Sequence, residues 1–169
     1  MLTTHPFDDD HLKEECGVVG IYGVEEAATH TVLGLHALQH RGQEAAGIVS
    51  FDGKFNAHRA QGHVADNFSQ HAVISKLTGH SAIGHTRYST TGENSLRNVQ
   101  PLYGDLHFGG FALGHNGNLT NAHTIREELV KRGSMFQSSS DTEVILHLMA
   151  THLRGNVIDR LINALHQVE

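Results

Sequence analysis

Apolar residues recur along this chain in short runs near its start and at helical spacing near its end. Runs bounded by glycines or turn residues predict strands at 16–22, 45–51, 54–59, 81–89 and 106–115. Apolar positions at helical spacing predict helices at 29–40, 66–77, 121–132, 141–153 and 157–166. Strands gather early and helices late, with no regular βαβ repeat, so we expect layered α and β elements.

Turn and capping residues mark several boundaries. Asp52-Gly53, between two of the strands, predicts a hairpin with a type I′ turn. Gly133 stands where a glycine commonly follows a helix and closes the helix at 121–132. Asp141 is a natural N-cap for the helix that begins at Thr142.

The composition narrows the class of protein. The chain has 169 residues, 38% of them apolar and 18% charged, as is typical of a soluble globular protein. The net charge is −6 and the lysines and arginines are scattered, so a nucleic-acid surface is not expected. No apolar run reaches the roughly 18–20 residues that span a bilayer, and the charged leader lacks the apolar middle of a signal peptide. We therefore expect a cytoplasmic protein without a nucleic-acid or membrane partner.

Sixteen histidines raise the question of a metal site. Only His36 and His40 have i,i+4 spacing, and the glutamate that follows the first histidine in the zinc-protease motif is absent. The other histidines show no paired spacing. We attribute them to composition and expect no metal site.

The chain has a single cysteine, Cys16, directly after a polar leader at 1–15. The leader has almost no apolar pattern, and we expect it to be a propeptide removed on maturation. Cys16 would then be the first residue, with its thiol as nucleophile and its own α-amine as base, since their ordinary pKa values are ~8.5 and ~8. Taken alone, the cysteine is equally consistent with a small buried hydrophobe at the start of a strand.

Four further segments are rich in glycine and polar residues. They lie at 38–48, at 84–92 together with 98–102, at 112–121 and at 138–143. With the CGVVG run that starts at Cys16, they follow the order of the motifs in the class II glutamine amidotransferases. From residue 16 to its end, the chain resembles the glutaminase domain of that class, in which an N-terminal cysteine is the nucleophile.

Two of these segments distinguish branches of the class. The glucosamine-6-phosphate synthases usually carry YRGYDSAG and TRWATHG. The corresponding stretches here are HRGQEAAG at 40–47 and TRYSTTG at 86–92. In both, the chain is more similar to the amidophosphoribosyltransferases, the family that catalyses the first step of de novo purine synthesis.

The resemblance implies a nucleophile and an oxyanion hole. Cys16 would attack the side-chain amide of glutamine, while Asn116 and Gly117 would donate hydrogen bonds to the developing negative charge. Losing one such donor typically slows an enzyme ~10²–10³-fold. Without its neighbours, the Asn116-Gly117 dipeptide is equally typical of a plain hairpin turn.

Four other residues are implied in substrate binding. Arg87 offers a planar fork for the α-carboxylate of glutamine, its alternative role being a surface ion pair. Asp141 would bind the α-ammonium group as well as cap its helix. Thr90 and Arg41 are candidates for packing around the substrate or the nucleophile, and Arg41 has the alternative of only bracing the loop over the site. Asn98–Leu102 is expected to be structural support.

The fold implied by the resemblance is α+β, the four-layer αββα sandwich of the N-terminal-nucleophile hydrolases, truncated at its C-terminal end. Residues 16–169 would form the glutaminase domain, with no cofactor or metal of its own. In the family, this domain continues past residue 169 and is followed by a phosphoribosyltransferase domain that binds phosphoribosyl pyrophosphate with Mg²⁺. Forms with a propeptide often carry a [4Fe–4S] cluster whose cysteines lie beyond the glutaminase domain, and the family forms homo-oligomers such as tetramers.

The function implied is the release of ammonia from L-glutamine and its transfer to phosphoribosyl pyrophosphate, giving 5-phosphoribosylamine. Two alternatives stay open: the glutaminase domain of another class II enzyme, such as an asparagine synthetase relative, and a catalytically inactive regulatory module of the same fold. The second is less favoured, because Arg87, Asn116, Gly117 and Asp141 are all retained with Cys16.

Overall fold

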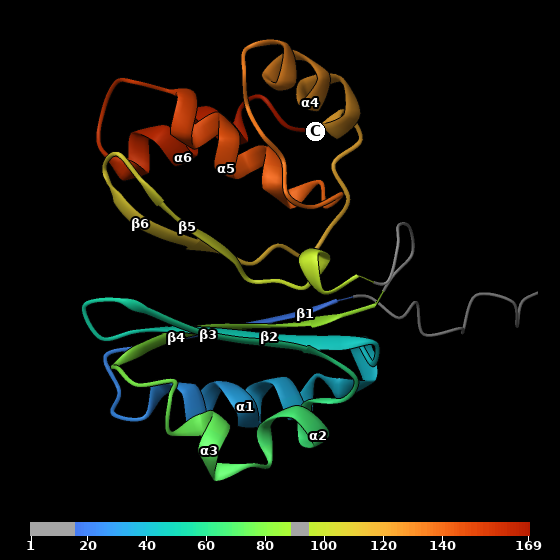
Figure 1. The fold of residues 1–169 in the computed structure, drawn as a ribbon, viewed down its shortest axis with the longest axis vertical. Helices are drawn as coiled ribbons and strands as arrows, with labels where there is room; N and C mark the ends of the chain where they lie inside the picture. The colour runs from blue at the N-terminus through green and yellow to red at the C-terminus, as the bar shows by residue number, and fades with distance from the viewer. Residues whose placement is uncertain (1–15, 89–94) are drawn as a thin grey trace, which may run out of the picture.

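The computed structural model describes residues 16–88 and 95–169, which form four layers in the order helix, sheet, sheet, helix (Figure 1). The first part of the chain, 16–88, builds one helical layer and the sheet beneath it. The second part, 95–169, builds the other sheet and the helices that cover it. The expected αββα arrangement is therefore present. No helix in these two ranges is long and apolar enough to cross a bilayer.

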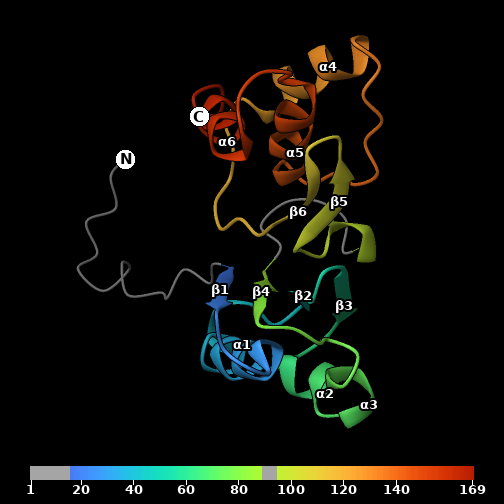
Figure 2. The same ribbon diagram turned by 90° about the vertical axis from the view of Figure 1, so that its left-hand side faces the viewer.

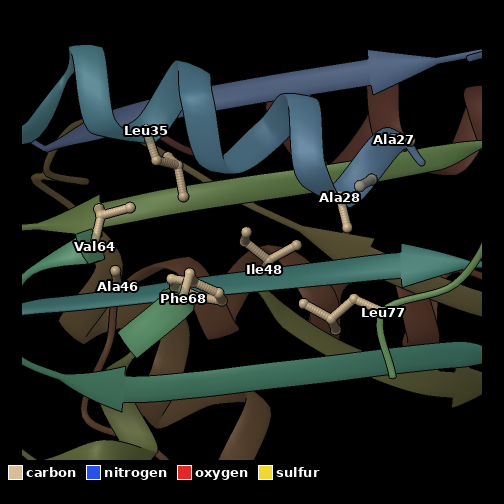
Figure 3. Packing of buried hydrophobic residues seen from close by; sticks show 9 residues of the cluster. Ala27, Ala28, Leu35, Ala46, Ile48, Val64, Phe68 and Leu77 are labelled. Atoms are coloured by element: carbon tan, nitrogen blue, oxygen red, sulfur yellow. The ribbon is translucent and has the colours of Figure 1, made fainter. Parts of the chain in front are cut away.

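The larger sheet is antiparallel, with the strand order β1-β4-β2-β3. Its strands are β1 (Gly17–Tyr22), β2 (Ala45–Phe51), β3 (Phe55–Gln61) and β4 (Ser81–Arg87). One face is covered by α1 (Ala27–Ala37), α2 (Val64–Phe68) and α3 (His71–Ile74). The core between them contains Leu35 from α1, Ile48 from β2, and Val64 and Phe68 from α2 (Figure 3).

The smaller sheet is a single hairpin that lies across the other face of the larger sheet (Figure 2). It consists of β5 (Leu102–Leu106) and β6 (Gly109–Leu113). Its outer side is covered by α4 (Ala122–Lys131), α5 (Thr142–Thr151) and α6 (Val157–Leu165). A second apolar core forms here, with Leu129, Val144 and Met149 almost fully buried.

Several predicted elements are confirmed and others need correction. The strands at the start of the chain and the three late helices lie where the pattern predicts them, within a few residues. The hairpin at 45–61 is also present, but Phe51 pairs with Phe55, so its loop has three residues instead of the two of a type I′ turn. The predicted helix at 66–77 is two short helices, α2 and α3.

The predicted strand at 106–115 is wrong. The chain turns at His107 and Phe108, so this stretch is the end of β5, a turn and then β6. Gly109 follows the turn with a φ of 115°, in the left-handed region that glycine adopts without strain. Gly109 and Gly110 stand at the start of β6, directly after the turn that joins the two strands.

The faces of β4 decide which side chains reach the space between the sheets. Gly84 faces α1, because a Cβ on it would lie 2.5 Å from Thr31 Cγ2. Side chains alternate along a strand, so His85 and Arg87 point the opposite way, toward the second part of the chain. Both line a cavity on that side, described below.

Gly47 on β2 permits the closest approach between the two parts of the chain. A Cβ at this position would lie 2.2 Å from the backbone oxygen of Gln100. That distance is too short for any side chain, so the segment that leads into β5 rests directly on the larger sheet. This segment carries Asn98 and Gln100, whose side chains hold the loops around the cavity.

We expect Gly47→Ala to lower the free energy of unfolding by about 1–3 kcal/mol, because the added methyl group must push the Gln100 backbone away. Denaturant unfolding measures this. Gly20→Ala is the control, since the nearest atom to its new Cβ, outside its immediate neighbours, is at 4.0 Å. Equal effects of the two substitutions would contradict the close contact at Gly47.

Candidate active site

A cavity of about 670 Å³ opens where the start of β1 and the end of β4 meet the loops of the second part of the chain. Residues from 16–88 form one wall: Cys16, His85, Arg87 and Tyr88. Residues from 95–169 form the other: Asn98, Gln100, His115, Gly117, Asn118, Leu119, Thr120, Ala122, His123, Arg126, Ser139, Ser140 and Asp141. The walls therefore combine one thiol, two guanidinium groups and one carboxylate.

Cys16 lies just before β1, and its surroundings fix it at the cavity. Its Sγ is 3.5 Å from both the backbone nitrogen and the backbone oxygen of Tyr88. The next residue, Gly17, donates its N–H to Thr86 Oγ1 at 3.1 Å. A Cβ on Gly17 would lie 2.8 Å from that oxygen and 2.9 Å from Leu38 Cβ, so a glycine is needed after the cysteine. Cys16 is half-buried, which contradicts the alternative of a fully buried small hydrophobe.

Arg87 is the last residue of β4 and lines the cavity together with Cys16. It is largely buried, with 8% of its surface exposed. That burial excludes the alternative of an exposed surface ion pair. A planar guanidinium at this position can hold a carboxylate by two parallel hydrogen bonds.

Asp141 stands on the opposite wall, at the N-terminus of α5. Its Oδ1 accepts from Thr142 N–H at 2.8 Å, which confirms the predicted helix cap. Its Oδ2 accepts from Leu119 N–H at 2.8 Å and so ties α5 to the loop after β6. Each carboxylate oxygen has a second lone pair, so a bound ammonium group can still be accommodated.

Asn116 and Gly117 lie in the loop between β6 and α4, so this dipeptide is not a hairpin turn between strands. Gly117 lines the cavity. A Cβ on Gly117 would lie 2.8 Å from Nε2 of His115, so a side chain there would have to displace the His115 ring. Asn116 is exposed and is not among the residues that line the cavity. The oxyanion role of the pair stays a prediction.

The remaining predicted residues are placed differently. Arg41 belongs to a short 3₁₀ helix, η1 (Gln39–Arg41), and is not one of the cavity-lining residues. Its Nε donates to the backbone oxygen of Cys16 at 3.3 Å, so it braces the chain at the nucleophile. Thr90 and the leader at 1–15 lie outside the described residues.

Asn98 and Gln100 link the sheet to the two loops that carry site residues. Asn98 exchanges two hydrogen bonds with Ser139, at 2.8 and 2.9 Å. Gln100 donates to Thr142 Oγ1 at 3.0 Å and accepts from His115 N–H at 2.7 Å. These contacts agree with the supporting role expected for the 98–102 segment.

The sequence did not single out His85, which the structure places two residues before Arg87 on the same face of β4. It is fully buried, and its Nε2 lies 3.1 Å from the backbone oxygen of His115. Burial lowers the pKa of His85 to about 4, so the ring is neutral at pH 7. The sequence did carry one signal for His85: side chains alternate along a strand, so His85 lies on the face opposite Gly84 and Thr86, which is the face of Arg87.

Glu143 is a second residue that the sequence did not assign. Its carboxylate accepts from Gln137 N–H, Ser138 N–H and Ser138 Oγ, at 2.6–2.8 Å. Burial alone would raise the pKa of Glu143, but His147 and these donors hold it at about 2. The carboxylate thereby shapes the 137–140 turn that leads into Asp141.

The described residues contain no group of three His, Cys, Asp or Glu side chains arranged to hold a metal ion. The residues that line the cavity include the thiol of Cys16, the buried guanidinium of Arg87 and the carboxylate of Asp141.

The family of the chain follows from its similarity to known proteins. The model of the glutamine amidotransferase domain family matches residues 69–161. An amidophosphoribosyltransferase of Lacticaseibacillus casei is 45% identical over 165 residues, covering 96% of this chain and 84% of the relative. The chain belongs to the amidophosphoribosyltransferase family. The predicted resemblance is thus confirmed, from an alignment that includes the Cys16, Arg87 and Asp141 regions.

Other amidophosphoribosyltransferases are much longer than this chain. The enzyme of Rhizobium etli is 55% identical over 168 residues, covering 99% of this chain but 34% of the relative. The solved structure of glutamine phosphoribosylpyrophosphate amidotransferase from Bacillus subtilis, complexed with ADP and GMP, matches with a TM-score of 0.83 and 46% identity. That match covers 90% of this chain and 33% of the other, and it confirms the predicted fold. The chain spans about a third of the length of these relatives.

We expect Glu143→Gln to destabilise the protein by about 1–3 kcal/mol at pH 7, because an amide cannot accept from all three donors. The pKa of Glu143 is lowered on folding, so the ionised carboxylate stabilises the fold fully above its ordinary pKa of 4.5. That stabilisation is lost as the pH falls toward 2. The difference in Tm between wild type and variant should therefore shrink over this window.

The control for this experiment is Glu127→Gln, since Glu127 is exposed on α4 and pairs with the exposed His123. It should change Tm little at any pH. A Tm difference for Glu143→Gln that stays constant between pH 5 and pH 2 would contradict the role assigned to its charge.

Proposed function

We propose that this domain hydrolyses the side-chain amide of glutamine, releasing glutamate and ammonia. One arrangement carries the proposal: the thiol of Cys16 lines the same cavity as the guanidinium of Arg87 and the carboxylate of Asp141. The two charges come from opposite walls and suit the α-carboxylate and α-ammonium groups of a free amino acid. The cysteine then meets the other end of the substrate.

The reaction proceeds through a thioester. Cys16 Sγ attacks the amide carbon of glutamine, and its proton passes to the α-amine of the same residue. The tetrahedral intermediate collapses with cleavage of the C–N bond, and the protonated α-amine returns the proton to the departing ammonia. Water then hydrolyses the thioester to glutamate and free thiol. This base exists only when Cys16 is the first residue, since an amide nitrogen does not accept the proton.

The oxyanion is stabilised by the loop after β6. The Gly117 N–H belongs to the wall of the cavity, and the Asn116 side chain is its immediate neighbour in the chain. Asn116 is exposed and does not line the cavity, so its amide would have to turn toward the cavity to act as the second donor. Both donors would then meet the charge that develops on the amide oxygen.

In the longer protein, the ammonia would be transferred to phosphoribosyl pyrophosphate to give 5-phosphoribosylamine. The family membership supports this activity, as does the similarity to the glutamine phosphoribosylpyrophosphate amidotransferase of Bacillus subtilis. Phosphoribosyl pyrophosphate and Mg²⁺ would bind outside the present chain. A homo-oligomer and a [4Fe–4S] cluster would likewise be properties of the longer protein. The present chain has a single cysteine, as is typical of a protein of the reducing cytoplasm.

We expect Cys16→Ala to abolish glutamine hydrolysis, because the nucleophile is lost. The longer protein carrying this substitution should still form phosphoribosylamine from added ammonium salt. Glutamate release and ammonia-dependent product formation measure the two activities separately. Loss of both together would contradict the assignment of glutamine hydrolysis to this domain.

Glutamine hydrolysis should also depend on removal of residues 1–15. Intact-mass measurement of purified protein gives the fraction of chains that begin at Cys16, and the specific glutaminase activity should rise in proportion to that fraction. A chain with one alanine inserted before Cys16 at the mature terminus should be inactive, because the α-amine is displaced. Activity in uncut chains would exclude the α-amine as the base.

A further inference from the structure

The loop that carries Asn116 and Gly117 is held through His115, the residue just before it. The His115 N–H donates to Gln100 Oε1 at 2.7 Å. The His115 carbonyl lies 3.1 Å from His85 Nε2. Both backbone hydrogen-bonding groups of one residue are therefore fixed by side chains from other elements of the fold.

The hydrogen bond to the carbonyl defines the state of the His85 ring. A carbonyl oxygen only accepts, so Nε2 must carry the hydrogen and Nδ1 must be the bare nitrogen of a neutral imidazole. Nδ1 is buried and has no hydrogen-bond partner among the described residues. Burial also lowers the pKa of His85 to about 4, although the hydrogen bond to the His115 carbonyl acts in the opposite direction, so the neutral tautomer persists at pH 7.

We propose that His85 is a positioning residue, whose Nε2–H holds the His115 carbonyl and so orients the Asn116–Gly117 segment as the oxyanion hole. The inference rests on the proposed hydrolysis of glutamine and names a determinant of that reaction outside the catalytic groups. His85 is unsuited to act as the base itself, because its Nε2 is engaged with the carbonyl and its Nδ1 is sealed from solvent.

The geometry of the peptide unit explains how the effect is transmitted. In a trans peptide the C=O and the following N–H point in opposite directions within one plane. Fixing the His115 carbonyl therefore fixes the plane of the His115–Asn116 peptide. The next peptide supplies the Gly117 N–H, and the His115 ring already lies against Gly117. With that plane fixed, the direction of the Gly117 N–H depends only on the φ and ψ angles of Asn116.

Three substitutions of His85 separate a hydrogen-bond donor from simple volume. In His85→Gln the amide nitrogen reaches about as far as Nε2, so it can donate to the same carbonyl. In His85→Asn the amide nitrogen reaches only the position of Nδ1. His85→Leu removes the donor and keeps an apolar group in the buried position. If His85→Leu does not fold, the comparison of Gln with Asn carries the test.

The experiment measures kcat and KM for glutamine hydrolysis in the protein that begins at Cys16. We expect kcat to fall ~10–10²-fold in His85→Asn and His85→Leu, up to the loss typical of one oxyanion donor. KM should stay nearly constant, because Arg87 and Asp141 are untouched. His85→Gln should restore kcat to near the wild-type value.

The rate of Cys16 alkylation by iodoacetamide is a second measurement. It reports the reactivity of the thiol in a reaction that forms no oxyanion. This substitution at a saturated carbon develops no charge on a carbonyl oxygen, so all three variants should react as the wild type does. Wild-type kcat in His85→Asn and His85→Leu would overturn the inference, as would an inactive His85→Gln or a parallel loss of alkylation. A wild-type protein that does not hydrolyse glutamine would instead refute the proposed function.

Discussion

The contact between Gly47 and the backbone of Gln100 is the constraint on which the rest of the structure depends. Only a glycine on β2 lets the segment before β5 lie against the larger sheet. From that position Asn98 reaches Ser139, while Gln100 reaches both Thr142 and His115. Arg59 on β3 adds a hydrogen bond to the Val99 carbonyl at 3.1 Å. One close approach of backbone thus determines where the two loops that carry site residues can lie.

The two parts of the chain are otherwise built independently. The apolar cluster beneath α1 contains residues of 16–88 only, and the cluster around α5 contains residues of 95–169 only. What joins them at the cavity is polar: buried side chains that hydrogen-bond to backbone groups. Directional bonds of this kind specify orientation in a way that apolar contact does not. A site that must hold donors at fixed angles is well served by a polar junction between two separately packed bodies.

The sequence predicted the parts of the fold that depend on local information. Gly133 follows the C-cap of α4 and Asp141 is the N-cap of α5, and both signals are visible in the chain itself. The β5–β6 hairpin was missed because its turn, at His107 and Phe108, lacks the residues that usually signal one. The roles of His85 and Gln100 depend on pairing between residues 15 to 42 positions apart, and no local pattern records such a contact.

The candidate site, like the fold, was predicted only in part from the sequence. Cys16, Arg87, Gly117 and Asp141 were predicted from motifs, and the structure brings all four to one cavity. Arg41 was also predicted, yet its side chain contacts the Cys16 backbone instead of lining the cavity. Asn116 was predicted with them, but it is exposed and does not line the cavity.

The position of Arg87 and Asp141 on opposite walls has a consequence for folding as well as for binding. A substrate held by both residues would bridge the two parts of the chain, in addition to contacts such as that between the Phe55 and Tyr103 rings. By mass action, such a ligand shifts the population toward chains in which the bodies are docked. Binding of the substrate and docking of the two parts of the chain are then thermodynamically linked, so each favours the other.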